Sequence, residues 1–209
     1  MNRNERFSRR ALLQSTAAIG VTACVKKPGF CAQPAIIDDG EFRTTEVCRL
    51  TAENLEGPFY ITDAPERNNF RIWDDEGVSV SLTGRVVAGD CSNALEGAII
   101  EFWHANPRGD YDNESTEMRY RGAIQVTSTG AYTLETLLPG RYLNGNQYRP
   151  HHIHVKIWDA DGSERLTTQL YFEGDDYLNC DPFANTSLVV PFEGDLATEI
   201  IAIDVDFIV

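Results

Sequence analysis

A period-two alternation of apolar and polar residues constrains the fold of this chain more than any other feature. Residues 78–83 (VSVSLT) and 201–207 (IAIDVDF) each place an apolar side chain at every second position. Period two is the spacing of side chains along one face of a β-strand. No segment of useful length shows the 3.6-residue period of an amphipathic helix. The chain is therefore predicted to be all-β.

Glycine-containing turns separate the predicted strands. Residues 97–105 (GAIIEFWHA) form an apolar run, and residues 122–137 divide into two strands around Thr129-Gly130. Residues 152–172 divide in the same way around Asp161-Gly162. Many short strands with such turns favour a β-sandwich or a β-barrel.

The N-terminal 23 residues have the pattern of an export signal. A basic start is followed by a short apolar stretch and a small-residue end. Arg9-Arg10 resembles a twin-arginine signal, and a general secretion signal is the alternative. The sequence Val21–Cys24 resembles a bacterial lipobox, in which Cys24 would carry lipid, and ordinary cleavage nearby is the alternative. The predicted location is the periplasm or the cell envelope, with membrane attachment through Cys24 if it is lipidated.

The rest of the chain is predicted to hold one folded domain. Residues 24–49 are polar and irregular and are predicted to be a linker or arm. Residues 50–209 are long enough to bury a substantial core. Within them, residues 50–60 are expected to open with a short helical turn, which Gly57-Pro58 would end.

Charge and cysteine content limit the partners and the redox environment. The formal net charge of −14 argues against nucleic acid and anionic lipid headgroups as partners. Apart from Cys24, four cysteines remain, and four cysteines in an exported chain can form two disulfides with three alternative pairings. The sequence does not fix the pairing of these residues: Cys31, Cys48, Cys91 and Cys180.

Three of the four histidines lie in one short stretch, RPHHIHVKIW (149–158). In a strand, His152 and His154 share a face and His151 points to the opposite side. Two imidazoles on one face form a partial metal site, although such a pair is as often structural. The nearest acidic residue after the pair is Asp159, so no local sequence motif completes the site.

Four separate motifs together resemble the intradiol ring-cleavage dioxygenases. They are WHANPRGDY (103–111), LLPGRY (137–142), RPHHIH (149–154) and TTQLYFEGD (167–175), in the order and near the spacing of that family. ENLEGPFY (53–60) also resembles the segment at the entrance of the family's pocket. The resemblance implies a β-sandwich of the intradiol dioxygenase type with an irregular N-terminal arm, so that residues 50–209 form the catalytic domain. It also implies a non-haem Fe(III) enzyme that cleaves a catechol ring between its two hydroxyl-bearing carbons with O2. The product would be a cis,cis-muconate-type diacid.

Matched motif by motif, the resemblance assigns four iron ligands. They are Tyr111, Tyr142, His152 and His154. Phenolate is a hard anionic oxygen donor, which favours Fe(III) over softer divalent metals. The resemblance further implies that Tyr142 gives way to the substrate and takes up a catechol proton.

The same resemblance assigns residues around the iron. Arg149 would stabilise negative charge on the substrate, and Gln169 would orient substrate or oxygen. His104 and His151 are interpreted as non-ligands. The pocket wall would contain Glu56, Gly57, Pro58, Phe59 and Tyr60, with Tyr60 the candidate for a polar contact to a ring substituent.

Two other classes of function remain open from the residues alone. One is a non-catalytic, extracytoplasmic β-sandwich that binds sugar or peptide in a tyrosine-lined groove and holds no iron. The other is a metalloprotein that binds copper or zinc. The sequence leaves open which catechol is the substrate. It also leaves open the oligomeric state, and a homo-oligomer is compatible with the sequence.

Overall fold

The computed structural model describes residues 48–197 and 201–209. The predicted export signal, Cys24, Cys31 and most of the predicted arm lie outside these residues. The described elements are β1 (Ser79–Val87), β2 (Ile99–Trp103), β3 (Arg121–Gln125), β4 (Ala131–Leu137), β5 (Tyr142–Asn144), β6 (Gln147–Arg149), β7 (His152–Trp158), β8 (Glu164–Phe172), η1 (Leu178–Cys180), η2 (Thr186–Leu188), β9 (Val189–Val190), β10 (Ile201–Asp204) and β11 (Phe207–Ile208).

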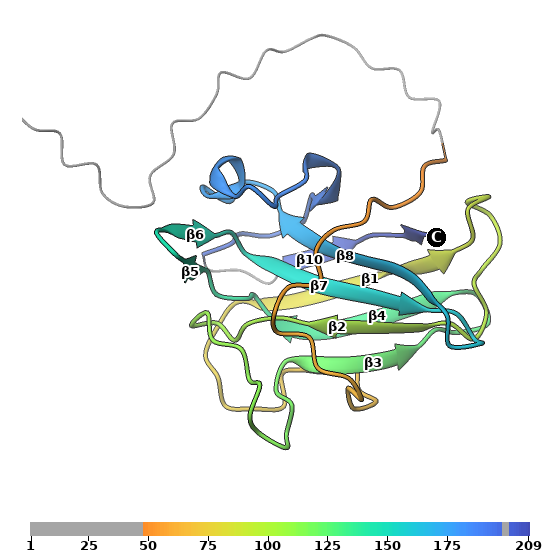
Figure 1. Cartoon of the computed structure of the whole chain (residues 1–209), viewed down its shortest axis with the longest axis horizontal. Coiled ribbons are helices and arrows are strands. Elements are labelled where there is room, and N and C mark those ends of the chain that lie inside the picture. Colours follow the sequence, from red (N-terminus) through yellow and green to blue (C-terminus); the bar gives the residue numbers. More distant parts are fainter. Residues whose placement is uncertain (1–47, 198–200) are drawn as a thin grey trace, which may run out of the picture.

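Two sheets pack face to face, which confirms the predicted all-β sandwich (Figure 1). One sheet has five strands in the order β3-β2-β7-β8-β9. In the other, β1 pairs with β4 in antiparallel fashion and with β10 and β11 in parallel fashion. A short hairpin of β5 and β6 stands apart from both sheets. The core between the sheets includes Val80, Leu82, Ile100, Phe102, Leu134, Ile153, Val155, Ile157, Leu170 and Ile203.

Local predictions from the sequence had mixed outcomes. The two strands around Asp161-Gly162 are confirmed as β7 and β8, and they pair with each other as a hairpin. The two strands around Thr129-Gly130 are also present, but they do not pair with each other: β3 pairs with β2, and β4 pairs with β1. The turn therefore carries the chain from one sheet to the other. The helical turn expected within residues 50–60 was wrong, since this segment contains no helix.

The two faces of β7 have different environments. Ile153, Val155 and Ile157 point into the core between the sheets. The alternate residues His152, His154 and Lys156 lie on the outer face of the five-stranded sheet, and all three are buried. An irregular segment, residues 51–60, which we call the strap, covers that outer face and crosses from β8 over β7 to β2 (Figure 1). The spacing of two along the strand thus separates a packing face from a polar face.

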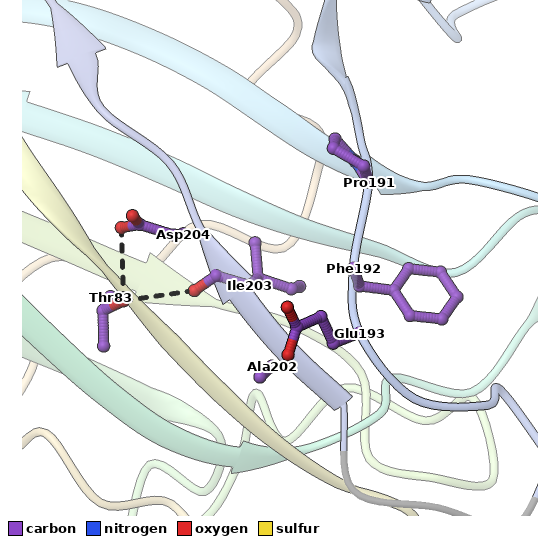
Figure 2. A pocket seen from close by; sticks show the side chains of 7 residues that line it. All are labelled: Thr83, Pro191, Phe192, Glu193, Ala202, Ile203 and Asp204. Carbon is purple, nitrogen blue, oxygen red and sulfur yellow. Dashed lines mark hydrogen bonds between the residues drawn. The ribbon is translucent and has the colours of Figure 1, made fainter.

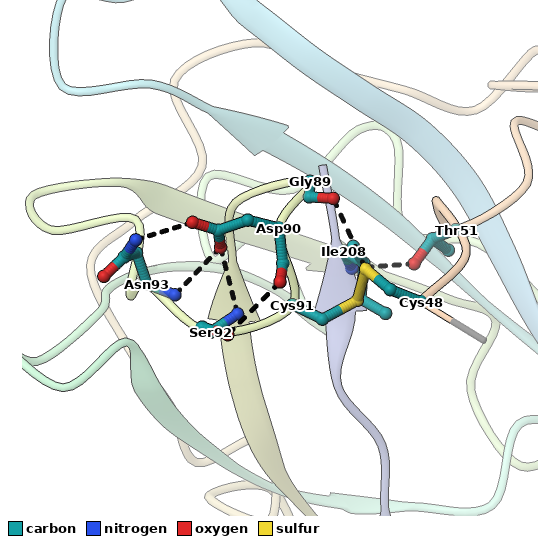
Figure 3. Close-up of a disulfide and its surroundings, with 8 residues drawn as sticks. All are labelled: Cys48, Thr51, Gly89, Asp90, Cys91, Ser92, Asn93 and Ile208. Atoms are coloured by element: carbon teal, nitrogen blue, oxygen red, sulfur yellow. Dashed lines mark hydrogen bonds between the residues drawn. A yellow bond between two sulfur atoms is a disulfide. The ribbon is translucent and has the colours of Figure 1, made fainter. Parts of the chain in front are cut away.

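A disulfide and a pair of hydrogen bonds fix the beginning of the strap. Cys48 is bonded to Cys91 in the loop after β1, with 5.7 Å between their Cα atoms (Figure 3). Thr51 exchanges two hydrogen bonds with Ile208 of β11: its N–H donates to the Ile208 carbonyl, and its Oγ1 accepts from the Ile208 N–H, both at 2.9 Å. Of the disulfide pairings that the sequence left open, the structure therefore contains Cys48–Cys91. Cys180 is disulfide-bonded as well.

Within residues 48–197 and 201–209, the structure contains no helix that is both long and apolar enough to cross a membrane.

Candidate metal centre

Three separate segments bring two phenols and two imidazoles together. His152 and His154 come from β7, Tyr142 begins β5, and Tyr111 lies in the loop between β2 and β3. The Oη of Tyr111 is 3.3 Å from Nε2 of His152 and 3.1 Å from Nε2 of His154. The Tyr142 ring lies 5.8 Å from the Tyr111 ring and 5.6 Å from the His152 ring, centroid to centroid. The four side chains singled out from the sequence are therefore neighbours.

The chemistry of these donors fits a shared cation. Nδ1–H of His152 donates to the Pro150 carbonyl at 2.7 Å, so its Nε2 presents a lone pair towards Tyr111. Donor atoms held about 2 Å from one ion are separated by about 3 Å, the spacing seen between Tyr111 Oη and the two Nε2 atoms. A single phenolic proton can be donated to only one of two imidazole nitrogens. An ion among these atoms would satisfy the lone pairs that the protein leaves unpaired.

Burial sets the protonation state of the cluster when no cation is bound. Burial, followed by the nearby charge of Arg149, lowers the pKa of His152 to about 3. Burial likewise holds the pKa of His154 well below its usual value. Burial and the neighbouring Tyr142 raise the pKa of Tyr111 well above 10. The imidazoles are thus neutral and able to bind metal at neutral pH, whereas the phenols need a cation to lose their protons.

Arg149 is the centre of a buried hydrogen-bond network beside the cluster. Its Nε–H donates to Oδ2 of Asp181 at 2.7 Å, and its Nη1 lies 3.3 Å from the Tyr142 hydroxyl. Its Nη2 donates to Oε1 of Gln169 at 2.8 Å and contacts the Tyr171 hydroxyl at 3.2 Å. Arg149 and Gln169, which the sequence assigned to the site, are therefore in direct contact with each other, and Arg149 also contacts the candidate ligand Tyr142.

The strap supplies a further wall of the cluster. A Cβ at Gly57 would lie 3.2 Å from Cε1 of His154, and the φ of +76° at Gly57 also disfavours any other residue. The Phe59 ring stacks on Tyr111 with 4.2 Å between centroids and meets Tyr142 edge-on. The Tyr60 hydroxyl donates to Glu101 at 2.8 Å, so it is already engaged within the protein. Pro58, also expected in the pocket wall, is exposed.

The two histidines interpreted as non-ligands lie outside the cluster. His104 is buried, with Nδ1–H donating to the Ala105 carbonyl and Nε2 accepting from Thr136. The ring of His151 bonds to the Pro139 carbonyl and lies 3.6 Å from Asp175. Both rings are thus occupied by partners other than the four donors.

Sequence reasoning missed three residues that contact the site. Trp103 stacks flat on His154, with 4.8 Å between ring centroids. Tyr171 lies opposite His152 on β8, two residues after Gln169, and so on the same face. That spacing was available as a signal in the sequence. Asp181 had none, because its loop has no periodic pattern.

The rest of the described structure contains no second cluster of the usual metal-binding residues. In residues 48–197 and 201–209, no group of three or more His, Cys, Asp or Glu side chains could hold a metal ion. A cavity of about 410 Å³ lies near β10, and Figure 2 shows its lining. None of the candidate site residues is in that lining, which consists of Thr83, Pro191, Phe192, Glu193, Ala202, Ile203 and Asp204.

Comparison with known proteins gives consistent matches. Residues 55–202 match a family model described as Dioxygenase. The chain is 33% identical over 159 residues to chlorocatechol 1,2-dioxygenase of Cupriavidus pinatubonensis, and the match covers 66% of this chain and 61% of that protein. It is 32% identical over 162 residues to catechol 1,2-dioxygenase 2 of Acinetobacter lwoffii, covering 68% of this chain and 58% of that protein. The chain thus spans less than two thirds of the length of these relatives.

Solved structures show the same relationship. The dioxygenase domain of a carbohydrate-binding fusion protein from Streptomyces sp. SirexAA-E matches with a TM-score of 0.68 and 30% identity, over 77% of this chain and 98% of that one. Catechol 1,2-dioxygenase from Pseudomonas arvilla C-1 matches with a TM-score of 0.66 and 27% identity, over 76% of this chain and 61% of that one.

Proposed function

The chain belongs to the intradiol dioxygenase family, and from that premise we propose that it is a non-haem Fe(III) enzyme that cleaves a catechol ring. The cleaved bond joins the two hydroxyl-bearing carbons, O2 is the co-substrate, and the product is a cis,cis-muconate-type diacid. The observation that carries this proposal is the approach of Tyr111 Oη to the Nε2 atoms of both His152 and His154.

The proposed ligands are Tyr111, Tyr142, His152 and His154. The two phenolates are hard, anionic oxygen donors that suit Fe(III), and the two neutral imidazoles are ligands that iron also accepts. When bound, Fe(III) would act as a Lewis acid that holds the catecholate and makes its ring reactive towards O2.

Tyr142 is the proposed acceptor of a catechol proton. The Tyr142 ring is more exposed than the core tyrosine Tyr132, and its hydroxyl lies 3.3 Å from Nη1 of Arg149. As a catechol binds, Oη of Tyr142, which would be deprotonated as an iron ligand, would accept one of the two hydroxyl protons.

Arg149 and Gln169 bind and orient the substrate in this proposal. The guanidinium is held by Asp181 and Gln169, so its charge is fixed beside the ring on which negative charge develops. The amide of Gln169 is oriented in turn, because its Nε2 donates to the Leu55 carbonyl of the strap at 2.7 Å. Phe59 excludes water from the two phenol rings that it covers.

The test uses the purified protein without added metal. We expect about one bound iron, a visible absorption band from tyrosinate-to-Fe(III) charge transfer, and O2 consumption with catechols, with the diacid identified by mass spectrometry. Tyr142→Phe should lower turnover at least about 10²-fold, in the range of acid–base contributions. Tyr132→Phe is the matched control, because Tyr132 lies in the core between the sheets and its hydroxyl donates to the Val205 carbonyl, not to a candidate ligand. Copper or zinc in place of iron, or full turnover of Tyr142→Phe, would contradict the proposal.

The substrate class and the location are part of the same proposal. Two relatives are named for catechol and chlorocatechol, so both compounds belong in the first substrate panel. Export to the periplasm or cell envelope, with lipid on Cys24, is tested by fractionation and by the mass of the mature N-terminus. A cytoplasmic protein that retains residues 1–23 would refute export.

A further inference from the structure

The strap is tied to the sheet in two different ways along its length. In its first part, hydrogen bonds to the strap's backbone hold it to β8: Asn54 N–H donates to the Thr167 carbonyl at 2.9 Å, and Thr168 Oγ1 donates to the Ala52 carbonyl at 2.7 Å. Gln169 Nε2 donates to the Leu55 carbonyl. Among the described hydrogen bonds, no backbone pairing ties residues 56–60 to the sheet. The second part must therefore be held by side chains.

Side-chain contacts of Glu56 and Tyr60 hold residues 56–60 to the sheet. The Lys156 ammonium forms an ion pair with Glu56, and its Nζ lies 4.3 Å from the centroid of the Tyr60 ring. The Tyr60 hydroxyl donates to Glu101 on β2. Lys156 itself is only 4% exposed and lies on the same face of β7 as His152 and His154. A buried ammonium needs such partners, because an unpaired one would be costly.

This second part of the strap carries the groups that touch the candidate ligands. Gly57 lies against His154, and Phe59 lies against Tyr111 and Tyr142. Glu56 immediately precedes Gly57 in the sequence. A shift at Glu56 is thus transmitted directly to the wall of the centre.

We infer that Lys156 and Glu56 form a latch that positions the strap over the metal centre and so sets how tightly the catechol is held. This inference rests on the proposed function. Lys156 is a positioning residue, since it acts through Glu56 and Tyr60 and contacts none of the four candidate ligands directly. It fixes where Gly57 and Phe59 stand relative to the substrate site.

The chain contains its own matched control for this inference. The Lys156 ammonium has a second carboxylate partner, Glu164 of β8, with 3.3 Å between Nζ and Oε2. The two carboxylate side chains are similarly exposed, 42% for Glu56 and 46% for Glu164. Glu164 belongs to the sheet and not to the strap. Loss of either partner removes one charge from the same ammonium, but only loss of Glu56 frees the strap.

The experiment compares Glu56→Gln with Glu164→Gln in two ways. In the purified protein, chymotryptic cleavage after Phe59 or Tyr60 should be at least about tenfold faster in Glu56→Gln, and unchanged in Glu164→Gln, because cleavage requires the strap to leave the sheet. In the iron-loaded enzyme, Glu56→Gln should raise the KM for catechol about five- to tenfold with kcat within about twofold, while Glu164→Gln leaves both unchanged.

The outcomes separate the latch from the proposed function. Equal effects of the two substitutions on cleavage and on KM would overturn the latch, because Lys156 would then merely need negative charge nearby. An unchanged rate of cleavage in Glu56→Gln would overturn it as well. If the wild-type protein held no iron and cleaved no catechol, the proposed function would fail, whereas the proteolysis comparison would still decide whether Glu56 holds the strap.

Discussion

The two faces of β7 are buried to a similar extent by opposite physical means. Ile153, with the other core-facing residues of the strand, is fully buried in apolar contacts, and these stabilise the fold without directional requirements. His152, His154 and Lys156 are at most 4% exposed, yet each is polar. Burying such groups costs free energy unless each finds a partner. The comparison teaches that burial alone does not distinguish a packing face from a functional one.

The polar residues of β7 differ in how completely their charges and lone pairs are satisfied, and the incompletely satisfied residues mark the site. Lys156 has two carboxylate partners, so its charge is satisfied within the protein. The two histidines share one phenolic hydroxyl, that of Tyr111. A packing face with unmatched lone pairs would be a defect, whereas a metal-binding face requires them.

The largest expected effect comes from removing a donor on the polar face. His152→Ala should lose its bound iron and reduce turnover at least about 10²-fold, since even residues that only support metal ligands contribute 10- to 100-fold. Iron content and the visible band measure the loss, and far-UV circular dichroism checks the fold. Full iron content and activity in His152→Ala would remove it from the ligand set.

A second large effect is expected where a charge is buried with its partner. Asp181→Asn should lower the free energy of unfolding by about 3–4 kcal/mol, because it leaves the Arg149 guanidinium buried without its carboxylate. The control is Asp159→Asn, whose pair with Arg165 is partly exposed and should cost less than about 1 kcal/mol. Urea unfolding of both variants measures the difference, and equal losses would contradict the role of burial.

His104 should make the free energy of unfolding depend on pH by about 3 kcal/mol. Burial, together with the nearby charge of Arg121, lowers its pKa from 6.5 to about 4 in the folded protein. Between these pH values the unfolded chain binds a proton that the folded chain does not. The stabilisation by neutral His104 is therefore complete above pH 6.5 and is lost as the pH falls towards 4. Urea unfolding of the metal-free protein at pH 7 and pH 4 should show about 3 kcal/mol less acid destabilisation in His104→Gln than in the wild type.

The smallest effect is expected for Ile153, which lies between the two histidines in the sequence and points to the packing face. Ile153→Val removes one methyl group from a fully buried side chain and should lower the free energy of unfolding by about 1 kcal/mol. Iron content and KM should not change, because Ile153 points away from the centre. A loss of iron in this variant would show that the two faces of β7 are not independent.

Much of the site was accessible from sequence because short-range rules apply to it. When two strands pair across a turn, residues at equal distances from the turn lie opposite each other. Around Asp161-Gly162 this rule places His154 opposite Gln169 and His152 opposite Tyr171, as observed. The same rule could have found Tyr171. Tyr111 and Tyr142 lie on irregular or edge segments with no periodicity, so only the resemblance to known dioxygenases singled them out.

Other features depend on contacts between distant segments. The Thr129-Gly130 turn looks like a hairpin turn locally, but β3 and β4 find better partners in different sheets. The helix expected at the start of residues 50–60 loses to hydrogen bonds with β8 and β11. The partners of Lys156 lie 100 residues before it and 8 residues after it, and no local pattern selects them.

The sequence by itself determined that the chain is all-β and that His152 and His154 share a face, because a period of two is a local property of an extended backbone. It did not determine which face of β7 would meet the opposite sheet and which would meet the strap. Only the tertiary structure decided that, and with it the pairing of Arg149 with Asp181 and of Lys156 with Glu56. Burial and charge pairing depend on segments far apart in the chain, which become neighbours only when the whole domain has folded.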